Sequence, residues 1–366
     1  MASWHQPLSF WEKAQETWSQ LVVLATALST SITAIFRGAN GAKTYKPCAQ
    51  RCHTQAIYYL HPTLSAVRSI PLQLKDPSTD EAYRQFMARQ GLQPDTVPLN
   101  HGAKGHWIGN KDAKSVLIYC HGGGFFLNAY AQHYNLIGHT IARLNESGHD
   151  LAVFFLSYSL TPHAVYPTQL RQSVEALRYI LTETGRPPEN VFLGGDSAGG
   201  NLSLAVLLHL THPHPDIEPL EISQPLAGVF GHAPWISYRT DGASVVENAF
   251  KDLVTVQGLD AWSSAYLAGK GGQGDPWSEP AKAPLEWWEG LKTEHVLIVV
   301  GRDEVLFSSV EEFVEKLRKV VPNTVYVIGQ GETHIAAVYA ADAVGVDTQQ
   351  SQAIINWLGA QLSVRH

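Results

Sequence analysis

The chain has 366 residues, 45% of them hydrophobic, so it can bury one large core and still carry an additional subdomain. Its 26 basic and 33 acidic residues give a net charge of -7 without a basic run, which excludes nucleic acid as a partner. The three cysteines are an odd and sparse set, which favours a reducing compartment over a disulfide-stapled secreted fold. We therefore expect a globular cytoplasmic protein, with membrane association left open by its N-terminal sequence.

The first 66 residues are predicted to form an N-terminal helical cap segment. Within them, the apolar stretch 21–36 is shorter than the ~20 residues that span a bilayer, and Ser and Thr interrupt it. Tryptophans precede it at the spacing of an amphipathic helix: Trp4, Trp11 and Trp18. Two roles stay open for this helix, packing on the body of the protein or contact with a membrane surface through residues 1–36.

Beyond residue 115, short β-type runs alternate with helical patterns. The expected strands are 115–120, 151–158, 190–195, 225–231, 295–301 and 324–329. The expected helices are 134–148, 167–185, 201–212, 308–320 and 351–362. Alternating apolar strands and helices predict an α/β fold with a mainly parallel sheet flanked by helices on both faces.

Residues 235–290, rich in Trp, Gly and Pro, interrupt this alternation between two expected strands. We interpret them, together with the N-terminal segment, as a helical cap above the carboxyl ends of the strands. Open α/β sheets bind their ligands at that edge. The cap is therefore expected to cover the functional site.

The stretch GGDSAGGN, residues 194–201, lies between an expected strand and an expected helix. It contains G-x-S-x-G, the pattern of a nucleophile elbow, in which glycines let the backbone turn sharply and leave the serine exposed. Ser197 would then lie at the N-terminus of a helix, where the dipole and free N–H groups favour developing negative charge. Ser197 is the predicted nucleophile.

A serine nucleophile needs donors for an oxyanion and a general base. The stretch HGGGFF, residues 121–126, follows the first expected strand, and its glycines allow backbone N–H groups to approach a carbonyl oxygen. Gly123 and Gly124, with Ala198 after the nucleophile, are the predicted oxyanion hole. His121 is expected to tether this loop, and His334, after the last expected strand, is the predicted base because the elbow order is Ser, acid, His.

With these motifs the sequence closely resembles the hormone-sensitive-lipase-like family of α/β-hydrolases, which is marked by HGGG and GDSAG. Residues 157–180 are similar to the family's Tyr-Arg-Leu-Ala-Pro segment, with Ser159 in place of Arg. GHAPWIS, at 231–237, and DPWSEPAKAPLEWWEGL, at 275–291, resemble the fungal branch. The resemblance covers about residues 70–362. It implies an α/β-hydrolase catalytic domain over residues 67–366, with the 235–290 cap insertion.

The triad acid is where the chain departs from the family pattern, which shows Asp-Pro-Leu after the strand. Here the sequence reads VVGRDEVLFSSVEEFVEKL and offers both Asp303 and Glu304. Aligned without gaps from the strand through Leu306, the resemblance places Glu304 on the family's acid, 30 residues before His334. Glu304 is the preferred acid and Asp303 the alternative.

The resemblance implies a serine carboxylic-ester hydrolase that acts through an acyl-enzyme. Five tryptophans of the insertion suit either an apolar pocket for a small to medium ester or simple packing: Trp235, Trp262, Trp277, Trp287 and Trp288. The alternatives are an acyltransferase, or a lactone-forming or thioester-cleaving hydrolase of secondary metabolism. A third is a non-catalytic small-molecule-binding protein. The expected partner is a small-molecule ester or acyl substrate, and a homodimer stays open.

No cofactor or metal is expected, because the sequence has no Walker P-loop, HExxH or dinucleotide fingerprint. Cys48 and Cys52 have no second Cys and His cluster at ligand spacing, and Cys120 lies in an apolar run as a core residue would. The stretch HLTHPHPD, residues 209–216, carries three histidines, but its prolines favour a solvated turn over a metal site.

Overall fold

A computed structural model describes residues 77–249, 251–339 and 347–364. The predicted N-terminal cap segment 1–66 lies outside the described residues, as do the membrane contact through residues 1–36 and the two cysteines Cys48 and Cys52. Cys120 is buried in the core, as predicted.

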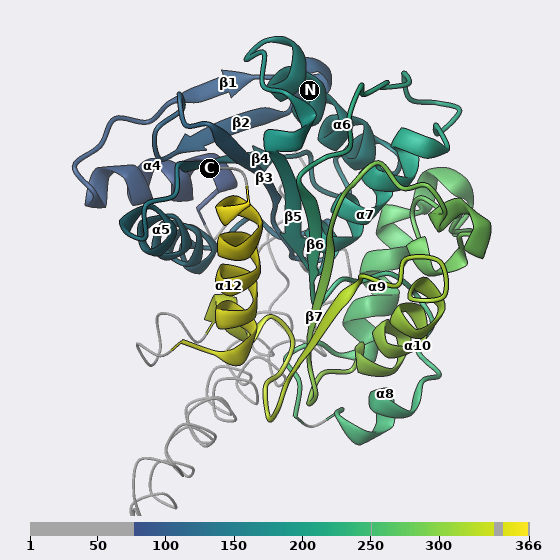
Figure 1. The fold of residues 1–366 in the computed structure, drawn as a ribbon. Coiled ribbons are helices and arrows are strands. Elements are labelled where there is room, and N and C mark those ends of the chain that lie inside the picture. Colours follow the sequence, from purple (N-terminus) through teal and green to yellow (C-terminus); the bar gives the residue numbers. More distant parts are fainter. Residues whose placement is uncertain (1–76, 250, 340–346, 365–366) are drawn as a thin grey trace, which may run out of the picture.

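The described chain is built on an eight-stranded sheet with the order β1-β2-β4-β3-β5-β6-β7-β8 (Figure 1). The strands are β1 (Thr96–Pro98), β2 (Lys104–Ile108), β3 (Ser115–Cys120), β4 (Leu151–Ser157), β5 (Val191–Asp196), β6 (Gly228–His232), β7 (Val296–Gly301) and β8 (Val325–Gly329). The β1–β2 and β2–β4 pairs are antiparallel, and every other neighbouring pair is parallel. The predicted mainly parallel sheet is confirmed.

Helices cover both faces of the sheet (Figure 1). The α-helices are α4 (Thr79–Arg89), α5 (Ala131–Glu146), α6 (Thr168–Thr182), α7 (Ala198–Thr211), α8 (Ala243–Glu247), α9 (Val256–Tyr266), α10 (Phe307–Leu317) and α12 (Gln349–Ser363). Alternate residues of β3 enter different cores: Val116 and Ile118 belong to the core that contains residues of α6, α7 and α10, whereas Leu117 and Tyr119 belong to the core that contains residues of α4, α5 and α12. The fully apolar strands therefore serve two cores, as expected of a sheet buried on both faces.

The antiparallel edge of the sheet was not predicted. Helix α4 and strands β1 and β2 precede residue 115, where the sequence pattern begins. Strand β1 has three residues and none of them is buried, so it carries no hydrophobic alternation to detect. Its pairing depends on β2, whose last four residues are buried.

Residues 235–290, the predicted cap insertion, connect β6 to β7 and contain α8 and α9. Three 3₁₀-helices accompany them: Ala268–Lys270, Pro280–Lys282 and Leu285–Trp288. Tyr266 at the end of α9 stacks on Phe125, with ring centroids 3.7 Å apart and an angle of 7°. The insertion is therefore packed against the loop after β3.

The stretch 209–216, which forms the last residues of α7 and the loop after it, is not the solvated turn that its prolines predicted. His209 and His214 are buried, and the backbone N–H of His214 donates to His209 Nδ1 at 3.0 Å. The ring of Trp277, from the insertion, meets the ring of His214 edge-on at 5.0 Å. Tertiary packing of the insertion over this loop explains the burial.

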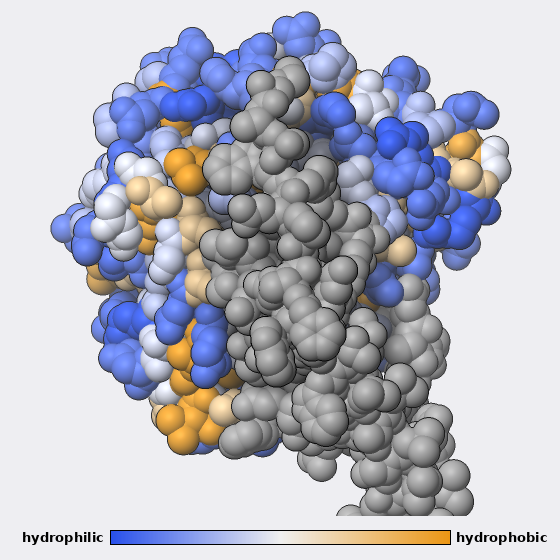
Figure 2. Space-filling view, turned by 180° about the vertical axis from the view of Figure 1, so that it is seen from behind, coloured by the Kyte–Doolittle hydropathy of each residue, from blue (hydrophilic) through white to orange (hydrophobic). Residues whose placement is uncertain are grey.

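The described surface on the face in Figure 2 is mainly hydrophilic, with apolar residues in small separate groups. Among the residues that the structure describes, five large apolar side chains are exposed: Leu92, Val246, Leu285, Val325 and Val364. Within the described ranges, no helix has both the length and the apolar character needed to cross a bilayer.

Candidate active site

The turn from β5 to α7 carries Ser197 in a strained conformation, with φ 51° and ψ -115°. A non-glycine residue adopts positive φ only where the surroundings enforce it. They do so here because α7 lies tightly against β3: a Cβ on Gly199 would lie 1.8 Å from the carbonyl oxygen of Cys120, and one on Gly195 would lie 2.3 Å from it. Both outer glycines of G-x-S-x-G are thus required by packing.

Three predicted site residues meet at the carboxyl edge of the sheet. Ser197 Oγ lies 2.9 Å from His334 Nε2, and His334 Nδ1 lies 2.9 Å from Glu304 Oε2. The three residues follow β5, β8 and β7, and their side chains are 8%, 2% and 0% exposed for Ser197, His334 and Glu304. With a proton on Nδ1 donated to Glu304, the Nε2 lone pair of His334 faces the serine hydroxyl.

Asp303, the alternative acid, lies elsewhere. Its carboxylate forms an ion pair with Lys251 Nζ at 3.2 Å and is 28% exposed, and its backbone N–H donates to Glu332 O. Adjacent residues at the end of β7 therefore point in different directions, Glu304 toward His334 and Asp303 toward the surface.

The glycine loop after β3 presents backbone N–H groups near the elbow. Gly123 has φ +100° and Gly124 has φ +62°, backbone conformations that favour glycine. The N–H groups of Gly123, Gly124 and Ala198 have no hydrogen-bond acceptor within the described part of the chain. A Cβ on Gly124 would lie 2.6 Å from the indole of Trp262, so the insertion closes one side of this loop.

Asp196, the residue before the nucleophile, anchors the glycine loop, a role that the sequence analysis missed. Its buried carboxylate accepts hydrogen bonds from Tyr119 Oη at 2.7 Å, the N–H of Gly122 at 3.0 Å and His133 Nε2 at 3.2 Å. Burial raises the pKa of Asp196, but the attraction of His133 and these hydrogen bonds outweigh it, so the net pKa is lowered. His121 ties the same loop through Nδ1, which donates to Gly122 O at 2.7 Å, as expected.

Burial governs the protonation of the two buried partners of Ser197. Burial lowers the pKa of His334, while the negative charges of Asp252 and Asp196 act in the opposite direction. Burial also raises the pKa of Glu304. Because desolvation disfavours the imidazolium, His334 rests in the neutral form that accepts a proton.

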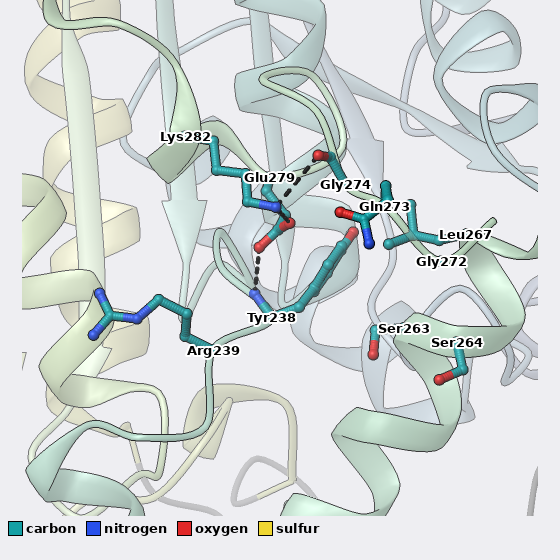
Figure 3. Close-up of a pocket in the computed structure, with 10 residues that line it drawn as sticks. All are labelled: Tyr238, Arg239, Ser263, Ser264, Leu267, Gly272, Gln273, Gly274, Glu279 and Lys282. Carbon is teal, nitrogen blue, oxygen red and sulfur yellow. Dashed lines mark hydrogen bonds and ion pairs between the residues drawn. The ribbon is translucent and has the colours of Figure 1, made fainter. Parts of the chain in front are cut away.

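A cavity of about 310 Å³ lies in the insertion, away from these residues (Figure 3). Its wall is polar, with Glu279 and Lys282 pointing toward each other and Glu279 accepting from the N–H of Tyr238 at 2.9 Å. Ser197, Glu304 and His334 do not line it. This cavity is too polar for the apolar pocket that the tryptophans suggested.

The five tryptophans of that suggestion differ in burial. Trp235, Trp262 and Trp288 are buried, whereas Trp277 and Trp287 are partly buried and pack on each other with ring centroids 5.1 Å apart. Trp262 lies against Gly124 of the glycine loop, and Trp235 stacks on Phe125 of the same stretch, with ring centroids 5.9 Å apart. Among the described residues, no group of three or more His, Cys, Asp and Glu side chains is arranged to hold a metal ion.

A family model described as alpha/beta hydrolase fold matches residues 117–338, more than half of the chain. The chain belongs to this α/β-hydrolase family. The matched region contains the glycine loop, the elbow and the loops that carry Glu304 and His334. The α/β-hydrolase fold and hydrolase class expected from the motifs are confirmed.

Named relatives of this α/β-hydrolase include an esterase from Acinetobacter venetianus, 27% identical over 71% of this chain and 82% of the relative. An acetyl-hydrolase from Streptomyces hygroscopicus is 31% identical over 62% of this chain and 70% of the relative. The structure of an esterase from the bacterial hormone-sensitive lipase family has a TM-score of 0.62 and 24% identity, over 86% of this chain and 98% of that one. These comparisons support the resemblance to hormone-sensitive-lipase-like proteins; the fungal branch stays a prediction.

Proposed function

We propose that this α/β-hydrolase is a serine carboxylic-ester hydrolase that acts on small to medium apolar esters through an acyl-enzyme. One observation carries the proposal: an unbroken series of hydrogen-bonding atoms from Ser197 Oγ to His334 and on to Glu304, each step 2.9 Å long. A buried serine, histidine and carboxylate in this order are the elements of an acyl-transfer triad.

In the first half of the reaction, Ser197 Oγ attacks the ester carbonyl carbon and its proton passes to His334 Nε2. The carbonyl oxygen becomes an oxyanion, for which the N–H groups of Gly123, Gly124 and Ala198 are the proposed donors. Glu304 keeps the imidazole in the Nδ1–H tautomer and stabilises the imidazolium. The carbon–oxygen bond to the alcohol then breaks, and His334 donates its proton to the leaving oxygen.

In the second half, water replaces the alcohol. His334 Nε2 accepts a proton from water as its oxygen attacks the acyl carbon, and the same donors hold the second oxyanion. Breakage of the bond to Ser197 returns the proton from His334 to the serine and releases the carboxylic acid. These steps use residues of this chain and water alone.

The relatives named esterase and acetyl-hydrolase support an ester as the substrate. The indole of Trp262 beside Gly124 supports a substrate with an apolar part near the reacting carbonyl. We also propose the division of the chain into a catalytic domain, 67–366, and a cap insertion, 235–290, since the latter packs over the glycine loop. Membrane contact through residues 1–36, a homodimer and a cytoplasmic location stay predictions.

The test is hydrolysis of p-nitrophenyl esters from acetate to dodecanoate by the wild type and Ser197→Ala. We expect turnover by the wild type, none above background by the variant, and the best kcat/KM among the shorter acyl chains. If neither turns over, a fluorophosphonate probe on Ser197 separates two cases. A labelled serine would point to an alcohol or amine acceptor in place of water, whereas an unlabelled serine would contradict the proposed nucleophile.

A further inference from the structure

Besides Glu304 and Asp196, a further buried carboxylate lies next to the triad, and it belongs to the insertion. Asp252, between α8 and α9, is 0% exposed. Its Oδ1 accepts from the backbone N–H of His334 at 3.0 Å and of Leu253 at 2.8 Å, while its Oδ2 accepts from the N–H of Val305 at 2.7 Å. One planar group thus contacts the triad histidine and the residue after Glu304.

Asn248, from the same segment, binds backbone carbonyl groups of the loop after β7 that carries Glu304, which we call the acid loop. Its Nδ2 donates to Arg302 O at 3.1 Å and to Glu304 O at 2.9 Å. Its Oδ1 accepts from Lys251 Nζ at 2.9 Å, and Lys251 pairs with Asp303 at the surface. The insertion therefore binds the acid loop at the N–H of Val305 and at the carbonyl oxygens of Arg302 and Glu304.

A carboxylate suits this position better than any neutral side chain. Each of its oxygens accepts, so it can receive N–H groups from two loops at once, whereas an amide has a single accepting oxygen. The loops follow different strands, β7 and β8, and a backbone hydrogen bond from the N–H of Asp303 to Glu332 O at 2.9 Å joins them nearer the surface. Asp252 connects the two loops at the level of the Glu304–His334 hydrogen bond.

Burying a carboxylate costs free energy, and this one has no cationic ion-pair partner among the described residues. The charged and titratable groups that act on it are His334 and Glu304, with the Lys251–Asp303 ion pair nearer the surface. Burial raises the pKa of Asp252 to about 6, and its negative charge raises the pKa of His334. The charge therefore favours the imidazolium that forms when Ser197 loses its proton.

We propose that Asp252 is a positioning residue of the triad: it holds the loops of Glu304 and His334 together, and its charge stabilises protonated His334. This inference rests on the proposed function, because it assigns Asp252 a role only if Ser197, His334 and Glu304 react as a triad. It also gives the insertion a part in catalysis that is separate from any contact with substrate.

The test compares the wild type with Asp252→Asn and with Asp260→Asn, a control that removes an exposed carboxylate from α9 of the same insertion. Rates are normalised to the fraction of Ser197 labelled by a fluorophosphonate. For Asp252→Asn we expect kcat to fall about 10- to 100-fold with KM changed less than about threefold. We expect the acid limb of kcat/KM to move to lower pH by roughly half to one unit. Asp260→Asn should match the wild type.

Wild-type kcat per labelled serine and an unmoved acid limb in Asp252→Asn would overturn the inference, even if the variant unfolds at a lower temperature. If Asp252→Asn does not fold, Asp252→Glu keeps the charge but displaces the carboxylate by a methylene. It should then lower kcat and leave the acid limb in place, and a wild-type kcat would overturn the positioning role. A wild type that is neither active nor labelled at Ser197 would instead reject the proposed function, and the inference with it.

Discussion

The nucleophile and its two partners are held by different parts of the chain. Ser197 is fixed by the sheet and its helix: β5 and α7 meet at a turn in which Gly195 and Gly199 contact the backbone of β3. Glu304 and His334 lie on loops after β7 and β8, and these loops are fixed by Asn248 and Asp252 of the insertion. The elbow itself is a turn between adjacent elements, although its glycines pack on β3, whereas the loops of Glu304 and His334 are joined to the insertion by hydrogen bonds between positions 53 and 82 residues apart.

This difference predicts how substitutions should affect activity on the nucleophile side, formed by Ser197 with β5 and α7, and on the acid and base side, formed by Glu304 and His334 with their loops. The nucleophile side depends on close backbone packing, so even one added methyl group should disrupt it. The acid and base side depends on buried hydrogen bonds and charge, so isosteric changes of a carboxylate should disrupt it without altering packing.

The largest effect is expected where both sides meet. Ser197→Ala and His334→Ala should each lower kcat by roughly 10⁴-fold or more, because triad members act as a unit. Ser309→Ala, a serine of α10 whose hydroxyl donates to Leu306 O, serves as the control and should retain wild-type kcat. Steady-state hydrolysis of p-nitrophenyl butyrate measures all three. Residual activity in Ser197→Ala close to the wild type would place the reaction elsewhere.

On the acid and base side, the test compares substitutions of the adjacent residues Glu304 and Asp303. Glu304→Gln should lower kcat by roughly 10³- to 10⁴-fold, because the amide no longer fixes the histidine tautomer. Asp303→Asn removes an ion pair with Lys251 at a partly exposed site, which contributes little, so kcat should stay within about twofold. The same ester assay measures both variants, and a larger loss in Asp303→Asn would exchange their roles.

The glycine loop beside the nucleophile is tested by one added methyl group. Gly124→Ala should lower kcat by roughly 10²- to 10³-fold, because its Cβ would lie 2.6 Å from Trp262 and the displaced loop would misplace an oxyanion donor. Gly91→Ala is a matched control, since Gly91 also has positive φ, +70°, but nothing lies within 4 Å of the added Cβ. Equal losses of kcat in the two variants would attribute the effect to backbone strain alone.

The smallest effect concerns pH. Burial lowers the pKa of His334, so the base should stay neutral and active below the ordinary imidazole pKa of about 6.5. Activity should be lost only as the pH falls through this lowered pKa. A kcat/KM profile of the wild type between pH 4 and 9 gives the acid limb; a limb above pH 7 would contradict the burial argument.

The difference between local sequence patterns and long-range contacts explains which features could be predicted from the sequence. The elbow, the glycine loop and the position of His334 after β8 follow from local patterns: glycine spacing, apolar strands and the Ser, acid, His order. The choice of Glu304 over Asp303 came from the resemblance to the hormone-sensitive-lipase-like family. Asp252 gave no such signal, because its partners are backbone N–H groups in loops far along the chain. Strand β1 and the buried histidines 209 and 214 were missed because tertiary pairing and packing determine them.

Trapping the acyl-enzyme tests directly whether Ser197 is the nucleophile. The wild type is mixed with excess p-nitrophenyl acetate, quenched in acid within the first turnover and digested for peptide mass spectrometry, with Ser197→Ala as the control. We expect an acetyl group on Ser197 in the wild type and none at that peptide in the variant. Turnover of the ester by Ser197→Ala, or acetylation of a different residue that forms and decays at the rate of turnover, would contradict it.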